Sequence, residues 1–420
     1  MAVRKIQIQE LKDVVERCAG IDVHKKTVSV CVIRGEGSQP AEGEVRQYGT
    51  TTRELQDLSN WLKQREVRHI VMESTGVYWK PVWQILESAG FHLLLANAKA
   101  VRNMPGKKTD TADCVWLATL LRKGLIQPSF IPPAEIRALR DLCRGRTTLV
   151  RERTRMVQRI EKLLEEGNIK LDCVISDLMG VSGRKMLEEL AAGETDAEQL
   201  AELALGRMRP KIPQLVLALE GHLRPHQIFL LKQWLAHFDE LSSRIEKFEQ
   251  EIEVYVLPFE PVLGALDAAP GVDRLSGATI LSEIGVDMRA FPTAAQFCSW
   301  ATLCPGNQES GGKRGSGRTR KGNRWLRGIM TQSAWAATHV KDSYYRAQYK
   351  RLAPRIGKQR ALVAVAHSML TAIWFMLAHN REYAELGADF FDRQNVEGQK
   401  RAAVKRLQRL GFTVTLQRAA

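Results

Sequence analysis

Four acidic residues in the first third of the chain have the types and surroundings of a metal centre. Asp22 lies in a segment rich in β-branched residues, and Glu73 ends a short apolar segment; both segments are predicted to be strands. Asp110 and Asp113 are three residues apart in the predicted first turn of a helix, so their side chains project from the same face. Two strand-borne acids and two helix-borne acids can therefore converge on one edge of a sheet.

Carboxylates gathered without a basic partner repel one another, and a divalent cation removes that repulsion. Mg²⁺ or Mn²⁺ prefers oxygen ligands and is the expected cofactor. Two such ions, roughly 4 Å apart, bind a scissile phosphate and stabilise its attacking and leaving oxygens. Taken singly, Asp110 and Asp113 have an ordinary explanation as helix N-terminal charges, Asp22 as a turn residue and Glu73 as a surface residue. Their combination in this order favours the metal centre.

A second group of chemistry-bearing residues lies far downstream, in the glycine-rich basic segment Glu309–Arg327. Flexible glycines let backbone amides approach a phosphate, and arginines bind it in a bidentate manner. The segment therefore predicts a nucleic-acid-binding loop. Its expected contact residues are Lys313, Arg314, Arg318, Arg320, Lys321, Arg324 and Arg327.

Ser310 stands at the start of this segment, before two glycines, and is a candidate nucleophile. A serine hydroxyl can attack a phosphodiester and hold the cut end covalently, provided that a base activates it. No His or Asp nearby in the sequence is spaced for that task, so activation must come from elsewhere in the fold, with the metal-bound carboxylates as one source. The alternatives are a loop that only binds nucleic acid, and Ser316 as the nucleophile in the same loop.

The composition indicates a soluble protein with a polyanionic partner. Hydrophobic residues make up 44% and charged residues 26% of the 420 residues, which is enough for two or three domains with cores. Lys plus Arg outnumber Asp plus Glu, 62 to 47, for a net charge of +15. Such an excess favours nucleic acid as a partner, because basic side chains release the counterions of phosphates. The alternative is a soluble protein that is merely basic.

Cysteine usage and hydropathy predict a cytoplasmic protein without a membrane anchor. The seven cysteines form no CxxC pair and are odd in number, so they are expected to be reduced core residues. The N-terminus lacks the apolar run of a signal peptide. Residues 361–380 are nearly long enough to cross a bilayer, but they are rich in Ala, contain His367, Ser368 and Thr371, and have no second span beside them. A buried core helix is the expected structure there.

The pattern along the chain predicts an α/β domain followed by helices. Strands are expected at 20–33, 44–50, 69–74 and 92–97, with helices at 52–64 (Thr52 as N-cap), at 76–90 and from 109 or 110 to 124. Strands that are first paired by a hairpin and then interleaved with helices give a sheet of mixed direction. Residues 134–257 contain no strand pattern and predict two long helices with a smaller helical insert at about 172–222.

The second long helix has the apolar spacing of a coiled coil. This seam has two interpretations of equal weight. One is an arm for self-association of the protein or for bridging nucleic-acid partners, and the other is a rigid helical hairpin packed within one chain. Apolar residues recur every three or four positions at Ile228, Leu231, Leu235, Phe238, Leu241, Ile245, Phe248, Ile252 and Tyr255. The domain boundaries predicted from these patterns are 1–17 for an extension, 18–128 for the α/β domain, 129–257 for the helical arm, 258–395 for a mostly α-helical C-terminal domain and 396–420 for a basic tail.

Four motifs together resemble those of the IS110/IS1111 insertion-sequence transposases. They are GIDVHKKTVSVCV, VMESTGVYW, KKTDTADCVWLA and LCPGNQESGGKRGSGRTRKGNRWLR, and they occur in the family's order over residues 18–395. The resemblance implies a RuvC-like (RNase H-like) DEDD domain, a coiled-coil arm and a transposase domain with a nucleophilic serine. It assigns the metal ligands to Asp22, Glu73, Asp110 and Asp113, and the nucleophile to Ser310.

The resemblance also implies an activity. Members of the family are DNA recombinases in which a structured bridge RNA pairs with donor and target DNA. The serine would attack the DNA backbone, with Mg²⁺ stabilising the leaving 3′ oxygen, in a dimer or tetramer built through the arm and acting at the bacterial nucleoid. Two alternatives stay open: a metal-only nuclease that resembles a Holliday-junction resolvase, and a non-catalytic nucleic-acid-binding scaffold, which leaves the four carboxylates unexplained.

Overall fold

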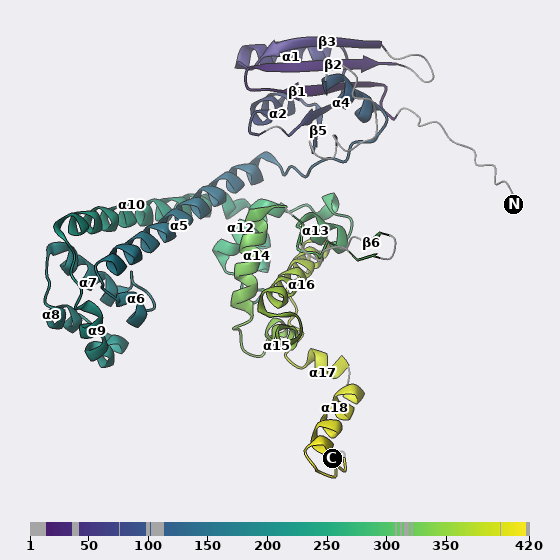
Figure 1. Cartoon of the computed structure of the whole chain (residues 1–420). Coiled ribbons are helices and arrows are strands. Elements are labelled where there is room, and N and C mark those ends of the chain that lie inside the picture. Colours follow the sequence, from purple (N-terminus) through teal and green to yellow (C-terminus); the bar gives the residue numbers. More distant parts are fainter. Residues whose placement is uncertain are drawn as a thin grey trace. The chain divides into compact units, whose positions relative to one another are not determined.

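The computed structural model describes the chain in two compact units, Met1–Ile131 and Pro132–Ala420 (Figure 1). The described residues are 14–35, 42–74, 76–97, 101, 113–306, 309–310, 313–314, 319–320, 322–394 and 396–416.

The first unit is built on a five-stranded sheet with the order β3-β2-β1-β4-β5. Its strands are β1 (Arg17–Val23), β2 (Thr27–Arg34), β3 (Glu42–Gly49), β4 (His69–Glu73) and β5 (His92–Ala96). The first three strands pair antiparallel through hairpins, whereas β4 pairs parallel with both β1 and β5. The predicted sheet of mixed direction is confirmed, but the single strand expected at 20–33 was wrong, because the chain turns after Val23 and forms β1 and β2.

Helices cover both faces of this sheet because its strands alternate apolar residues between two cores. One core packs the side chains of Ile21, Val23 and Ile70 against α1 (Thr52–Gln64) and α2 (Trp79–Ser88). The other packs Cys18, Cys31 and Val71 against α4 (Asp113–Arg122). The expected start of the last helix at 109 or 110 lies outside the described residues.

The N-cap of α1 is Thr51, so the prediction of Thr52 was wrong by one residue. The Thr51 side chain accepts a hydrogen bond from the Glu54 backbone N–H, and the Glu54 carboxylate accepts one from the Thr51 backbone at 3.1 Å. This capping box needs an acid three residues after the cap, and Glu54 stands at that distance from Thr51 and not from Thr52.

The second unit begins with two long antiparallel helices, α5 (Ala134–Glu166) and α10 (Pro225–Val256), side by side in Figure 1. The Phe248 ring lies against Gly145 near one end, and Arg153 Nη1 donates to Ser242 Oγ at 3.3 Å further along. The apolar seam of α10 is thus covered by a helix of the same chain. The predicted helical insert packs on the far ends of both: α6 (Leu171–Val174), α7 (Val181–Ala192), α8 (Ala197–Glu202), η1 (Gly206–Lys211) and α9 (Ile212–Leu219).

The rest of the second unit is also mostly helical, as predicted. Its elements are η2 (Leu257–Phe259), α11 (Glu260–Asp267), α12 (Arg274–Ile284), η3 (Met288–Ala290), α13 (Ala294–Trp300), β6 (Glu309–Ser310), β7 (Lys313–Arg314), α14 (Arg324–Ala337), α15 (Tyr344–Ile356), α16 (Lys358–His379), α17 (Phe390–Gln394) and α18 (Val396–Arg409). Within the described part of the chain, α16 alone is long and apolar enough to cross a membrane. One of its faces is buried against α13, α14 and α15, as in a core helix.

All seven cysteines are free thiols. Five of them are buried, which agrees with the expectation of reduced core residues. Cys173 is exposed and Cys304 is half-buried, so the expectation was too broad for these two. Cys173 lies in the four-residue helix α6, which is too short to bury every side chain.

Candidate functional site

Asp22 and Glu73 lie at the carboxyl ends of two neighbouring parallel strands. In the register of β1 and β4, Ile21 pairs with Met72, so the two acids are the next residues along each strand. Side chains alternate along a strand, and Val71 belongs to the core on the α4 face. Glu73 is therefore on that face, and Asp22 shares it with Cys18. Both acids are half-buried.

A glycine brings α4 close to the strand that carries Asp22. A Cβ atom added at Gly20 would lie 2.2 Å from the Cys114 carbonyl oxygen and 2.4 Å from the Ala118 backbone nitrogen. Only glycine therefore permits this approach of helix to strand. Cys18, earlier on β1, contacts Ala118 through its sulfur at 3.5 Å. The helix thus runs antiparallel to β1, and its first residue, Asp113, lies toward the strand end that carries Asp22.

The electrostatics agree with this placement of Asp22 and Asp113. Burial raises the pKa of the Cys114 thiol, and the negative charges of Asp22 and Asp113 raise it further. Two of the predicted ligands, one from β1 and one from α4, thus act on the same buried thiol. Asp22 also has a neighbour on its solvent side, since His24 Nε2 lies 3.1 Å from Asp22 Oδ2.

The structure brings three of the four predicted ligands to one end of the sheet and does not describe the fourth. Asp110 lies outside the described residues. Among the residues that are described, no three His, Cys, Asp or Glu side chains are close enough together to hold a metal ion. The donor set of carboxylate oxygens suits a hard divalent cation, and completing it would require Asp110.

Ser310 lies in a short antiparallel hairpin where the sequence predicted a loop. Strand β6 pairs with β7, so that Ser310 is opposite Lys313 and Glu309 is opposite Arg314. A bridge between Pro305 and Thr319 closes the segment further out. Of the other predicted residues, Ser316, Arg318 and Lys321 lie outside the described part of the chain.

The remaining three predicted nucleic-acid contacts differ in their surroundings. Arg320 donates from Nη2 to Ser299 Oγ at 2.7 Å and to the Ser299 carbonyl at 3.3 Å, which ties the end of the segment to α13. Arg324 is exposed and Arg327 half-buried, both in the first turn of α14. The sequence did not indicate the anchoring bonds of Arg320.

Sequence reasoning also missed Glu283, a carboxylate whose side chain is only 1% exposed. Arg144 Nε and Nη2 donate to its two oxygens at 2.7 and 2.8 Å, and Asn323 Nδ2 donates to Oε2 at 2.6 Å. Arg140 donates to the backbone carbonyls of Ser282 and Glu283, and burial lowers its pKa to about 10 although Glu283 opposes that shift. The available signal was a lone acid in a run of small and apolar residues.

Two sequence models of transposases match the chain. One, described as a transposase, matches residues 19–169, and the other, described as the transposase IS116/IS110/IS902 family, matches residues 264–350. The chain belongs to the IS110 family of transposases. The first match spans all four predicted metal ligands, and the second spans Ser310. Membership makes the chain a transposase, an enzyme that cleaves and rejoins DNA.

Curated relatives of this IS110-family transposase include insertion-sequence proteins of bacteria. The transposase for insertion sequence element IS1111A of Coxiella burnetii is 23% identical over 398 residues, which are 91% of this chain and 95% of the relative. The transposase for IS1533 of Leptospira borgpetersenii is 31% identical over 159 residues, covering 36% of this chain and 44% of the relative. A Thermus thermophilus RuvC structure matches with a TM-score of 0.21 and 16% identity, over 27% of this chain and 99% of that one.

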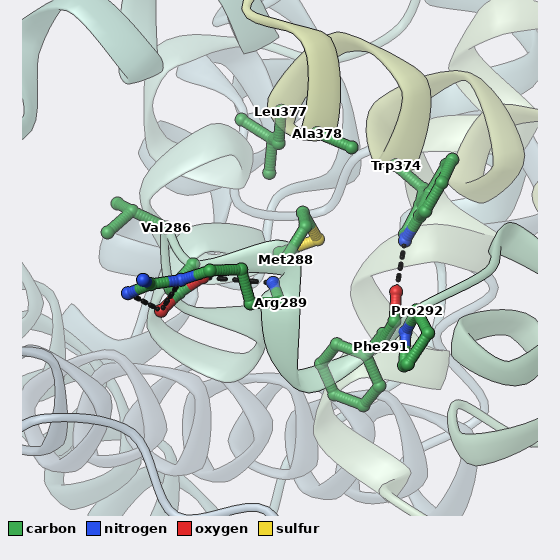
Figure 2. Close-up of a pocket in the computed structure, with 9 residues that line it drawn as sticks. Val286, Met288, Arg289, Phe291, Pro292, Trp374, Leu377 and Ala378 are labelled. Carbon is green, nitrogen blue, oxygen red and sulfur yellow. Dashed lines mark hydrogen bonds and ion pairs between the residues drawn. The ribbon is translucent and has the colours of Figure 1, made fainter.

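The transposase also has a hollow of about 520 Å³ between η3 and the end of α16, but this hollow lacks the groups of a catalytic centre (Figure 2). Its lining is mostly apolar, with Trp374 Nε1 donating to the Phe291 carbonyl at 2.9 Å. The two charged residues in the lining, Arg289 and Asp287, pair with each other at 2.7 Å.

Proposed function

We propose that this transposase cuts and rejoins donor and target DNA through Ser310, with Mg²⁺ (or Mn²⁺) held by Asp22, Glu73, Asp110 and Asp113. The observation that carries the proposal is that Asp22, Glu73 and Asp113, on β1, β4 and α4, all lie toward one end of the sheet, with Gly20 allowing α4 to approach. The serine lies in a hairpin that begins a basic segment, as a nucleophile for a polyanionic substrate requires.

The proposed step exchanges one phosphodiester bond for another. The Ser310 hydroxyl oxygen forms a bond to the DNA phosphorus, the bond from phosphorus to the 3′ oxygen breaks, and the serine proton ends on that 3′ oxygen. The carboxylates bind the cation, which supplies positive charge at the leaving oxygen when bound. Reverse attack by the 3′ hydroxyl of the other duplex releases the serine and completes strand exchange.

We further propose that a structured bridge RNA guides the enzyme and that the active form is a dimer or tetramer. The support for RNA is the net charge of +15 and the basic segment that follows Ser310. The support for assembly is chemical, because exchange between two duplexes requires two nucleophiles. In this proposal the helices α5 and α10 form a coiled-coil arm through which the subunits associate. The enzyme would act on DNA in the bacterial cytoplasm.

A covalent adduct tests the nucleophile. A suicide DNA substrate, nicked so that the cut strand diffuses away, should trap the wild-type protein, and digestion should place the adduct on Ser310. Ser310→Ala should lose cleavage and keep DNA and RNA binding, since only a hydroxyl oxygen is removed. An adduct on Ser316 would move the role to that residue. Metal-dependent cutting by Ser310→Ala without an adduct would establish the resolvase-like, metal-only nuclease instead.

The RNA partner is tested by what co-purifies with the protein. Purification from cells that carry the whole element should recover one dominant small RNA, whose binding weakens steeply as salt rises. A random mixture of fragments would contradict RNA guidance while leaving the DNA recombinase intact.

A further inference from the structure

Three arginines from two helices surround Trp325, at the start of α14. The guanidinium carbons of Arg151, on α5, and of Arg324, on α14, each lie 4.8 Å from the Trp325 ring centroid. That of Arg144, also on α5, lies 5.7 Å away. A ring face attracts and orients such cations, so Trp325 holds arginines of both helices at one place. The place adjoins a hollow of about 100 Å³ between α5, α12 and α14.

The charges at this place are only partly neutralised. Arg144 is neutralised by Glu283 and its neighbour Arg146 by Glu249, both through hydrogen-bonded ion pairs. In the described part of the chain, Arg151, Arg324 and Arg327 have no carboxylate within ion-pair distance. Arg151 and Arg324 are exposed. A protein gains nothing in stability from gathering like charges, so these arginines indicate an anionic partner.

The same charge continues along α5. Arg155, Arg159 and Lys162 follow Arg151 at intervals of four, four and three residues, and all four side chains are exposed. This spacing places them on one face of the helix, while Ile160, on the far side, is buried. At 1.5 Å per residue the line is about 16 Å long. Two acids, Glu152 and Glu161, are sequence neighbours of these basic residues.

We infer that Arg151, Arg155, Arg159 and Lys162 of α5, with Arg324 and Arg327 of α14, form a binding track for the phosphodiester backbone of a nucleic acid. We call these six residues the basic track. It extends the contact surface from the serine segment onto the long helix α5, with Trp325 fixing the junction. The inference rests on the proposed function in one respect, that the partner is nucleic acid. Guanidinium groups suit it because they bind phosphate in a bidentate manner.

The salt dependence of binding tests the track. The track variant is Arg151→Gln, Arg155→Gln and Arg159→Gln combined. Its matched control removes the same charge from exposed residues elsewhere in the second unit, by Lys185→Gln, Arg207→Gln and Lys232→Gln. Each phosphate contact adds about 0.9 to the slope of log K against log salt on duplex DNA, and about 0.7 on a single strand. The salt slope of the track variant should therefore be smaller than that of the wild type by about 2 to 3. The salt slope of the control should be almost the same as that of the wild type.

Two probes distinguish the sources of the backbone: a DNA duplex of mixed sequence and a single-stranded RNA of the same length. A reduced slope on the duplex alone assigns the track to DNA, and a reduced slope on the RNA alone assigns it to RNA. A reduced slope on both probes means that the track binds the backbone of either nucleic acid. Equal slopes for the track variant and the control on both probes would overturn the inference, even if the Ser310 adduct forms. A reduced slope without any adduct would uphold the track and count against the proposed function.

Discussion

The carboxylate of Glu283 receives two hydrogen bonds from the guanidinium of Arg144, at 2.7 and 2.8 Å, in a site where Glu283 is almost completely buried. The same carboxylate accepts a bond from Asn323, whose side-chain oxygen caps α14 by accepting from the backbones of Trp325 and Leu326. One buried charge thus joins α5, α12 and α14. The Glu283 carboxylate therefore fixes the start of α14, where the chain leaves the serine segment.

Glu283→Gln should destabilise the second unit by about 2 kcal/mol. Removing one member of a buried ion pair leaves the other charge poorly compensated, which usually costs 3–5 kcal/mol; we expect less because Arg144 is one-third exposed. Urea unfolding followed by circular dichroism measures the difference. The control is Glu246→Gln on the exposed face of α10, which should change stability by less than about 0.5 kcal/mol. Equal stability of the two variants would show that the pair is dispensable.

Gly20→Ala should displace α4 from β1 and lower both stability and activity. The added methyl group would meet backbone atoms of Cys114 and Ala118 that cannot move independently of the helix. Overpacking of this kind costs about 2 kcal/mol, and here it also separates Asp113 from Asp22. Thermal unfolding and a recombination assay measure the two effects.

The control for Gly20→Ala is Gly264→Ala in α11. A Cβ atom there would meet nothing within 4 Å, and the exchange favours a helix by up to about 1 kcal/mol. It should leave recombination unchanged. Wild-type stability of Gly20→Ala would mean that α4 does not lie as close to β1 as described.

The sheet and its acids could be predicted from the sequence because local patterns determine them. Alternating Val28, Val30 and Val32 indicate a strand, and a lone Asp22 in a run that is otherwise apolar indicates an acid carried by that strand. The break between Val23 and Thr27, which puts Asp22 near the end of β1, was not predicted. Glu73 followed from the same reasoning. The mixed direction of the sheet followed from the order of hairpins and helices.

Contacts between residues far apart in the sequence could not be predicted in this way. Arg144 and Glu283 are separated by 139 residues, and nothing in the pattern around either one identifies the other. Gly20 was the first residue of the strand expected at 20–33, and nothing in that pattern indicated that α4 packs against it. The apolar seam of α10 indicated that a helix covers it but not that the helix is α5, since a heptad pattern specifies pairing and not the partner.

The stability of the second unit should fall as the pH rises from 9 to about 11, partly through Cys143. Burial between α5 and α12 raises the pKa of this thiol from 9.0 to about 11, and the charge of Glu283 contributes less. The folded state keeps the proton to higher pH than the unfolded chain. The contribution of the protonated Cys143 thiol to the free energy of unfolding is therefore complete below pH 9 and is lost as the pH approaches 11.

Cys143→Ala tests this contribution through the slope of the free energy of unfolding against pH, and not through the stability at one pH. The variant should be less stable near neutral pH, because a buried sulfur is removed. Its free energy of unfolding should nevertheless fall less steeply above pH 9, by up to about 1.4 kcal/mol per pH unit. Cys173→Ala, which changes an exposed thiol, should keep the wild-type slope. Parallel curves for Cys143→Ala and the wild type would contradict the assignment.

The four carboxylates carry the last prediction. Asp22→Asn, Glu73→Gln, Asp110→Asn and Asp113→Asn should each abolish recombination in Mg²⁺, because an amide is a weaker ligand than a carboxylate for a hard cation. None should unfold the protein, since removing one charge from a repelling group relieves repulsion in the absence of metal. Asp57→Asn, which changes an exposed acid on α1, is the control and should recombine normally. Near-wild-type recombination by any of the four would remove that residue from the metal site, and activity in Asp110→Asn alone would reduce the site to Asp22, Glu73 and Asp113.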